Sequence, residues 1–218
     1  MNTNIKTLLS NFISPLSCAV CGRPLKTGLF CDRCGMTVSK NTLDSKFYRS
    51  DCFAYFFYTN KVANFINAFK ERRKLSYAAD LAKLMAPHLK KTVKRLNPSF
   101  IVPVPDFGEI GASLEIPTTE LLCQELSKQL GIRYSGKILR KIKRTEQQKN
   151  LNARDRAANL TGAFEVPKKY KNRVRRRTIF LVDDVSTTGA TLAECKTALY
   201  TAGAAKVFCI TVAKTMKF

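Results

Sequence analysis

The chain has 218 residues, of which 45% are hydrophobic and 25% are charged. This composition suits a folded globular protein and excludes wholesale disorder. The charge is unbalanced, because 38 Lys and Arg residues against 16 Asp and Glu residues give a formal net charge of +22. Such an excess favours a polyanionic partner, which could be nucleic acid, an anionic membrane surface or a multiply phosphorylated ligand. The single histidine, His88, excludes a metal centre built from several histidines.

The N-terminal segment predicts a short amphipathic helix over residues 2–13, where apolar side chains recur at helical spacing. Residues 1–16 contain one Lys and several Asn and Ser residues, which makes a poor signal peptide. No apolar run reaches the length of about 18 residues that a membrane span needs. We therefore predict a cytoplasmic protein.

The eight cysteines fall into two groups. Four are scattered through apolar segments, as expected of buried thiols in a reducing compartment. The other four form two CxxC pairs, each followed by glycine: Cys18, Cys21, Cys31 and Cys34. Two such knuckles supply four thiolates, which suits tetrahedral Zn²⁺ with no open position and therefore a structural ion. Nine residues separate the pairs, enough for a small hairpin to return. Paired disulfides and redox chemistry are the alternatives.

The remaining elements follow in chain order. A continuous aromatic run predicts a buried strand over 52–58, and two stretches of helical spacing predict helices within 61–96. Strands over 100–104, 178–182 and 207–212 then alternate with helices over 118–130 and 188–202, and residues 145–160 are predicted to form a loop with a short helix. Such alternation indicates an α/β fold with a doubly wound parallel sheet and helices on both faces.

The segment from Thr178 to Thr191 contains the most informative pattern. An apolar strand ends in Asp183 and Asp184, and a loop rich in Ser, Thr and Gly then opens a helix. Ligands bind at the carboxyl edge of a parallel sheet, where helix amides and hydroxyls can hold a phosphate. Two carboxylates repel a bare phosphate, so their own ligand should be a diol or a Mg²⁺ ion. A phosphate beside a diol describes a ribose 5-phosphate. The alternative is an N-capped helix that follows a strand and binds no ligand.

This segment resembles the signature of type I phosphoribosyltransferases, which bind 5-phosphoribosyl-1-pyrophosphate (PRPP). The resemblance extends to the ComF family of competence proteins, which join a four-cysteine zinc finger to a phosphoribosyltransferase domain. The middle of the chain matches the family's spacing at Ile101-Val-Pro103-Val-Pro105, Leu139-Arg140, Thr145-x-x-Gln148-x-x-Leu151 and Arg156-x-x-Asn159-x-x-x-Ala163-Phe164. The resemblance to this family implies a zinc finger within residues 1–45 and a phosphoribosyltransferase-like domain over 46–218.

The resemblance also implies roles for individual residues. Asp183 and Asp184 would meet the ribose hydroxyls, in part through Mg²⁺, and would be the catalytic pair of any transfer reaction. The loop that would enclose the 5-phosphate consists of Val185, Ser186, Thr187, Thr188, Gly189, Ala190 and Thr191. The turn of Asp106, Phe107 and Gly108 would occupy the pyrophosphate position, and Arg140 and Arg156 would cover the pyrophosphate.

Two departures from the family pattern argue against transfer chemistry. Where the family carries an Arg-Gly-Phe-Asn stretch, this chain has Leu114-Glu115-Ile116-Pro117. The pyrophosphate turn lacks Lys and Arg and carries Asp106 and Glu109. A departing pyrophosphate needs positive charge to compensate it. The enzymatic activity is therefore left open.

A basic stripe runs from Lys137 to Arg177, with 15 Lys and Arg residues against three acidic residues and a local net charge of +12. Binding of a nucleic-acid backbone to such a stripe is favoured because it releases counterions from the phosphates. Unpaired bases could stack on Tyr134, Phe164 and Tyr170. The candidate contacts with single-stranded DNA are Lys137, Arg140, Lys141, Lys143, Arg144, Arg154, Arg156, Arg175, Arg176 and Arg177. The alternative is a solvated loop face.

The first hypothesis is therefore a DNA uptake protein of natural transformation that binds single-stranded DNA in the cytoplasm and carries a PRPP and Mg²⁺ site. The resemblance implies a helicase-like DNA translocase as a partner and a peripheral position at the inner face of the inner membrane. The second hypothesis is an active phosphoribosyltransferase with an unknown acceptor. A third, a relative of purine repressors, is disfavoured because the sequence shows no recognisable helix-turn-helix.

Overall fold

The structure is a computed structural model, and it describes residues 17–42, 51–72, 75–105, 116–143 and 160–215. The elements in chain order are α2 (Asp32–Ser39), β1 (Cys52–Phe57), α3 (Asn60–Arg72), α4 (Leu75–Leu96), β2 (Phe100–Pro103), α5 (Thr118–Leu130), β3 (Arg140–Lys141), β4 (Phe164–Glu165), α7 (Lys168–Val174), β5 (Thr178–Ser186), α8 (Ala190–Thr201) and β6 (Lys206–Lys214). Within these ranges, no helix combines the length and the apolar character that crossing a bilayer requires.

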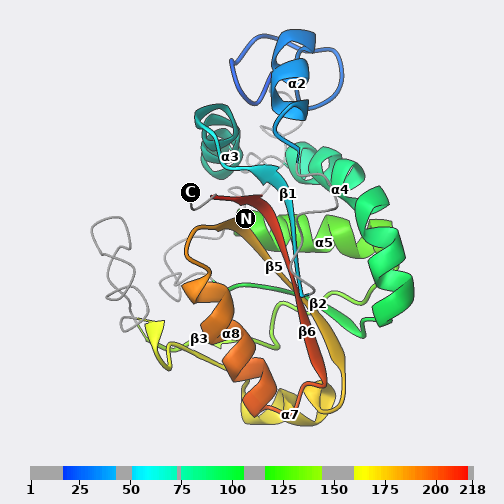
Figure 1. Cartoon of the computed structure of the whole chain (residues 1–218), viewed down its shortest axis with the longest axis vertical. Helices are drawn as coiled ribbons and strands as arrows, with labels where there is room; N and C mark the ends of the chain where they lie inside the picture. The colour runs from blue at the N-terminus through cyan, green and yellow to red at the C-terminus, as the bar shows by residue number, and fades with distance from the viewer. Residues whose placement is uncertain (1–16, 43–50, 73–74, 106–115, 144–159, 216–218) are drawn as a thin grey trace, which may run out of the picture.

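The centre of the molecule is a parallel sheet with the strand order β1-β6-β5-β2. Helices lie on both of its faces, with α4 and α5 on one side and α8 on the other (Figure 1). Side chains of successive strand residues point to opposite faces, so the apolar run of β5 supplies both cores. Phe180 and Val182 belong to one core, and Ile179 and Leu181 to the other, all four fully buried. The predicted doubly wound architecture is confirmed.

The larger core joins the sheet to α3, α4 and α5. Its largest fully buried side chains include Tyr77, Phe65, Phe69 and Leu122. The four-cysteine segment contributes to the same core through Ala19, Leu29 and Val38. The segment between residues 17 and 42 therefore packs directly against the helices that cover the sheet.

Two contacts fix this segment on the helices. The rings of Phe30 and Phe65, on α3, meet edge to face with centroids 5.2 Å apart. The Tyr77 hydroxyl, on α4, donates a hydrogen bond of 2.7 Å to the Ser17 carbonyl. The predicted boundary near residue 45 falls in residues 43–50, outside the described residues.

The second core lies under α7, α8 and the short antiparallel pair β3–β4. Leu192, Cys195 and Leu199 line one side of α8, at the three- and four-residue intervals that place side chains on one face of a helix. This packing fixes the start of α8 at the carboxyl end of β5.

Most predicted elements are found, with shifted ends. The helix over 118–130 is confirmed at both ends, because Gly131 follows it in the left-handed conformation at φ 66°. The strand expected over 178–182 continues to Ser186, and the helix expected from residue 188 begins at Ala190. The predicted helix over 2–13 and nearly all of the predicted loop over 145–160 lie outside the described residues.

Candidate functional site

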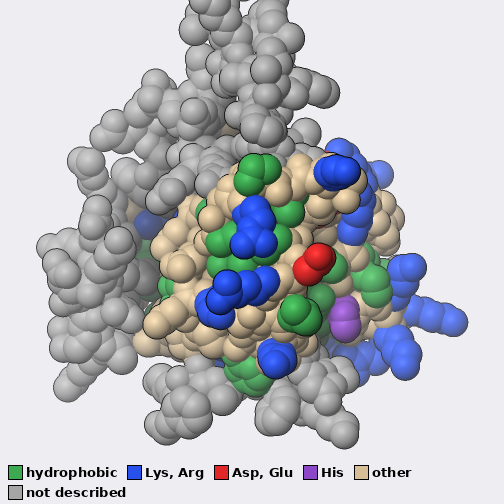
Figure 2. All heavy atoms as spheres, turned by 90° about the horizontal axis from the view of Figure 1, so that it is seen from above, with side chains coloured by type: hydrophobic (Ala, Val, Ile, Leu, Met, Phe, Trp, Pro, Cys, Tyr) green, Lys and Arg blue, Asp and Glu red, His purple; other side chains and the backbone are tan. Residues whose placement is uncertain are grey.

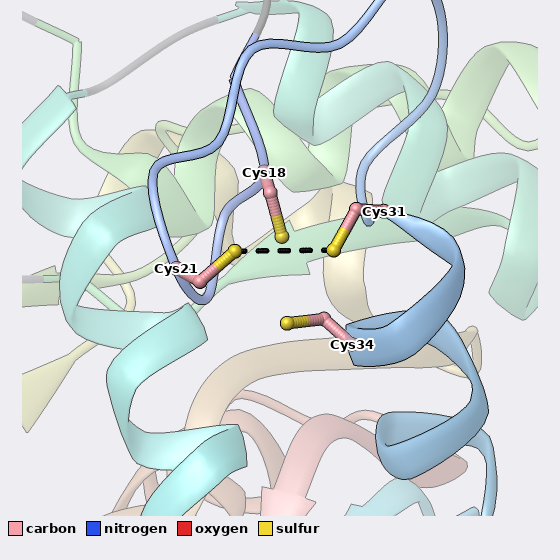
Figure 3. A group of neighbouring side chains, drawn as sticks. All are labelled: Cys18, Cys21, Cys31 and Cys34. Carbon is pink, nitrogen blue, oxygen red and sulfur yellow. Dashed lines mark hydrogen bonds between the residues drawn. The ribbon is translucent and has the colours of Figure 1, made fainter.

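The four paired cysteines come together at one point. Cys18 and Cys21 lie on a tight loop, in which the Gly22 amide bonds to the Cys18 carbonyl, and Cys31 and Cys34 lie at the start of α2. All four sulfur atoms lie within 4.8 Å of one another and point toward a common centre (Figure 3). Instead of a ladder of strands between the pairs, the described segment has an isolated antiparallel bridge between Ser17 and Pro24.

The spacing of the sulfur atoms fits a metal ion. Cys21 Sγ and Cys31 Sγ are 3.8 Å apart, whereas a disulfide would bring them to about 2.05 Å. Sulfur atoms at about 2.3 Å from a tetrahedral Zn²⁺ are themselves about 3.8 Å apart. All eight cysteines are free thiols in the structure. The cluster could therefore hold a metal ion through four sulfur ligands.

Electrostatics favours a cation at the cluster. Burial raises the pKa of Cys18, but hydrogen bonds from the backbone of Cys31, Cys21 and Val20 outweigh it and lower the pKa to about 6. Burial and the three neighbouring sulfur atoms raise the pKa of Cys34 to about 12. Four thiolates at this spacing repel one another, so full ionisation of the cluster needs a bound positive charge.

The acidic pair lies at the carboxyl end of β5, still within the sheet. Asp183 pairs with Thr211 of β6, and Ser186 pairs with Lys214. Asp183 Oδ1 accepts a 2.9 Å hydrogen bond from the Asp184 amide, and Asp184 Oδ1 accepts one of 2.6 Å from the Val185 amide. The two side chains are thus held by the backbone of their own strand.

The two carboxylates have different electrostatic surroundings. Asp184 forms an ion pair through Oδ2 with the ammonium of Lys70, which comes from the last turn of α3. Burial, followed by repulsion from Asp184, raises the pKa of Asp183 to about 8. The pair therefore resists carrying two negative charges in the absence of a ligand.

The loop after the acidic pair joins β5 to α8. Gly189 caps the helix at φ 82°, a conformation that favours glycine, and its carbonyl accepts the Ala193 amide at 2.9 Å. Thr215, just beyond β6, bonds the carbonyls of Ser186 and Thr187, so the outer side of the loop is fixed. The first amides of α8 have no acceptor within the helix, which gives this end a preference for anions. The structure thus brings Asp183, Asp184 and the whole predicted loop together.

Other predicted residues of this site lie outside the described residues. They are the predicted pyrophosphate turn of Asp106, Phe107 and Gly108, together with Arg144, Arg154 and Arg156. Arg140 is described, on β3, and its guanidinium is paired with Glu165 of β4.

The described part of the basic stripe divides between two places. Arg140, Lys141 and Lys143 lie on or beside the β3–β4 pair, and the Lys143 ammonium bonds to the Thr161 carbonyl. Phe164 is buried and offers no exposed stacking surface, whereas Tyr134 is partly buried and its hydroxyl bonds to Glu120. The expectation that Phe164 could stack on bases was wrong, and the one for Tyr134 stays a prediction.

The second part lies at the opposite end of the sheet from the acidic pair. Arg175, Arg176 and Arg177 form the exposed turn between α7 and β5. The Arg176 amide bonds to the Gly203 carbonyl, and the Arg177 carbonyl accepts the Ala205 amide, so the turn is held against the start of β6. We call the exposed side chains of Arg175, Arg176 and Arg177 the arginine turn.

Three residues that the sequence did not single out lie beside these sites. Lys70 reaches the acidic pair, Lys206 is exposed beside the arginine turn, and Tyr200 is 44% exposed near the same end of the sheet. Their basic or aromatic character was visible in the sequence, but only the packing of α3 and α8 shows where they lie.

Positive charge also covers the end of the molecule that carries α2. Seen from this end, blue side chains prevail over red ones on the described surface (Figure 2). The four-cysteine segment contributes exposed basic side chains, namely Arg23, Lys26, Arg33 and Lys40. The basic character of the protein is therefore not confined to the predicted stripe.

The fold and the site define a class of protein. It is a phosphoribosyltransferase-like protein with an attached cysteine cluster. Four features define this class: a parallel sheet covered on both faces, an acidic pair at a strand end, a Ser/Thr/Gly loop that opens a helix, and an N-terminal four-cysteine module.

Comparison with known proteins identifies the family. The chain is 30% identical over 186 residues to Competence protein F of Haemophilus influenzae, with 81% of each chain covered. It is also 30% identical over 204 residues to the DNA utilization protein YhgH of Escherichia coli K12, covering 87% of this chain and 86% of that protein. The chain therefore belongs to the ComF family.

Phosphoribosyltransferases are among the solved structures to which the chain is similar. The adenine phosphoribosyltransferase of Saccharomyces cerevisiae is 20% identical, with a TM-score of 0.42 over 69% of this chain and 73% of that one. No protein-family model matches the sequence.

Proposed function

We propose that this protein is a ComF-type protein of natural transformation that handles incoming single-stranded DNA and binds PRPP with Mg²⁺. Two of its relatives carry names that refer to competence and to DNA utilization. The single observation that carries the proposal is the acidic pair on β5 beside the loop that opens α8. This arrangement offers carboxylates that can bind a diol or a metal ion, next to amides and hydroxyls that can bind a phosphate.

The sugar-phosphate site would work through two kinds of group. Amides and hydroxyls from Ser186 to Thr191 would hold the 5-phosphate at the positive end of α8. Asp183 and Asp184 would hold the ribose hydroxyls, with Mg²⁺ supplying positive charge between the carboxylates and the pyrophosphate. Since Asp183 resists ionisation in the free protein, arrival of the metal would favour its charged form.

The cysteine cluster would hold Zn²⁺. The four sulfur ligands and their spacing fit this ion, and they leave no position for a substrate. Because the segment packs on α3 and α4, the ion would stabilise the main fold as well as its own loop.

Single-stranded DNA would bind through exposed basic side chains. The described candidates are the arginine turn and the basic residues beside β3 and β4, with Tyr170 and Tyr200 as partly exposed aromatic rings that could stack on bases. We further propose that the protein acts in the cytoplasm, at the inner face of the inner membrane, beside a helicase-like DNA translocase. Co-purification of the translocase with the tagged chain from competent cells would support this placement, and its absence would count against it.

The acidic pair also favours a second candidate function, transfer of ribose 5-phosphate. In that reaction the bond from the anomeric carbon to pyrophosphate breaks, the pyrophosphate leaves with the electron pair, and an acceptor bonds to the carbon. Asp183 and Asp184 would stabilise the positive charge that develops on the sugar. Release of pyrophosphate in the presence of a base, an amine or a nucleic acid would demonstrate this activity.

Calorimetry with PRPP and Mg²⁺ tests the main proposal. The wild type should bind, and the double variant Asp183→Asn, Asp184→Asn should lose at least about tenfold in affinity, or 1.4 kcal/mol. The variant Asp80→Asn makes the same chemical change on α4 and should leave binding unchanged. Equal affinity in the wild type and the double variant would show that the acidic pair does not hold the sugar.

A further inference from the structure

Lys70 is the cation that the described structure places on the acidic pair. It extends from the last turn of α3, next to the fully buried Phe69 in the core. Its side chain is 49% exposed, whereas that of Asp184 is 16% exposed. The ammonium therefore reaches from a fixed helix, along the surface, to a carboxylate that is mostly covered.

Both oxygen atoms of Asp184 are occupied. Oδ1 accepts the Val185 amide at 2.6 Å, and Oδ2 is paired with the Lys70 ammonium. The amide contact joins neighbouring residues of the same strand. An ammonium at Oδ2 repels a divalent cation that approaches the same carboxylate, so such a cation binds more readily once Lys70 has moved away.

The two partners differ in how easily they move. Asp184 is fixed by its backbone contact and by the pairing of β5 with β6, whereas lysine has four rotatable bonds and half of this side chain faces solvent. Displacement would consequently move the ammonium and leave the carboxylates in place.

We propose that Lys70 is a positioning residue that substitutes for a metal ion at the acidic pair of the free protein. This inference rests on the proposed sugar-phosphate site and assigns to it a built-in competitor for Mg²⁺. Lys70 holds the Asp184 carboxylate in place, and it suppresses binding of a divalent cation that arrives without the sugar phosphate. The site would thus select the complex of metal and sugar phosphate over the metal alone.

The test measures binding of the metal alone, to protein whose cysteine cluster has been filled with Zn²⁺. Mn²⁺ serves as the probe, because the electron paramagnetic resonance signal of free Mn²⁺ is lost on binding. Lys70→Met should bind Mn²⁺ about fivefold more tightly than the wild type, the factor that a half-exposed ion pair at the upper end of its usual strength represents. Lys70→Arg retains the charge and should bind Mn²⁺ as the wild type does.

Two further variants separate a local effect from a general one. Lys61→Met removes the same charge from an exposed position on the same helix and should leave Mn²⁺ binding unchanged. Lys70→Met combined with Asp184→Asn should abolish the gain. An unchanged Mn²⁺ affinity in Lys70→Met, or an equal gain in Lys61→Met, would overturn the role of Lys70.

The outcome is independent of the PRPP experiment. Tighter Mn²⁺ binding in Lys70→Met without any PRPP binding would retain the role of Lys70 and refute the sugar-phosphate site. PRPP binding with no effect of Lys70→Met on Mn²⁺ binding would retain the sugar-phosphate site and refute the role of Lys70.

Discussion

Replacing the three side chains of the arginine turn by Gln should weaken binding of single-stranded DNA in a way that depends on salt. All three side chains are exposed, and the turn is held by backbone hydrogen bonds to Gly203 and Ala205, so the substitutions remove charge without removing those bonds. For single strands, each phosphate contact contributes about 0.7 to the slope of log K against log salt concentration. Loss of three contacts should reduce the slope by about 2.

The affinity change follows from the same relation. If the three contacts act only through counterion release, a slope change of about 2 corresponds to roughly 50-fold weaker binding at physiological salt of about 0.15 M. Fluorescence anisotropy of a labelled oligonucleotide, repeated at several salt concentrations, measures both quantities.

A matched control removes the same charge elsewhere. Changing Lys83, Lys90 and Lys94 to Gln lowers the net charge equally, at exposed positions on a different element, α4. This variant should change the slope much less. If both triple variants behave alike, DNA responds to the overall charge of the protein and the arginine turn is not a binding surface.

Three further predictions concern the cysteine cluster, the acidic pair and the core. Cys34→Ala leaves three sulfur ligands and should reduce zinc in the purified protein below about half an ion per chain, measured by elemental analysis; full occupancy would contradict a four-ligand site. Because the folded pKa of Asp183 is raised from 3.8 to about 8, ionisation of this group costs stability, and the stability that the neutral form contributes is lost as pH rises through this range. Asp183→Asn should therefore raise the melting temperature at about pH 8 and much less at about pH 5; an equal rise at both would show that the folded-state Asp183 is already charged at pH 5 and that its pKa is not raised to about 8. Phe65 is fully buried between Phe30 and Phe69, so Phe65→Ala should cost about 3–5 kcal/mol in urea unfolding, against less than about 1 kcal/mol for Tyr58→Ala at a 39% exposed position.

The strongly patterned parts of the fold could be predicted from the sequence. The apolar run of β5 and the capping Gly131 after α5 are local signals, and the structure has these elements where the residues predict them. The acidic pair was assigned to a strand end because polar residues begin there. In the structure β5 continues through it, since pairing with β6 extends to Ser186 and depends on a partner far along the chain.

Other features had no local signal. The strands β3 and β4 have two residues each, too few to show an alternating pattern. The helix α7 is almost entirely polar and basic, with Val174 as its buried residue, so its sequence resembles a loop. The contact of Lys70 with Asp184 joins residues 114 positions apart and could not be derived from either neighbourhood.

The length of β5 has a consequence for how two anions could share this protein. Arg177 precedes the strand and Asp183 lies near its far end, so about 20 Å of backbone separates them at roughly 3.3 Å per residue. Ligands bound at these ends would not exclude each other sterically. A polynucleotide could stay attached while sugar phosphates exchange many times, and any effect of one ligand on the other would have to pass through the strand itself.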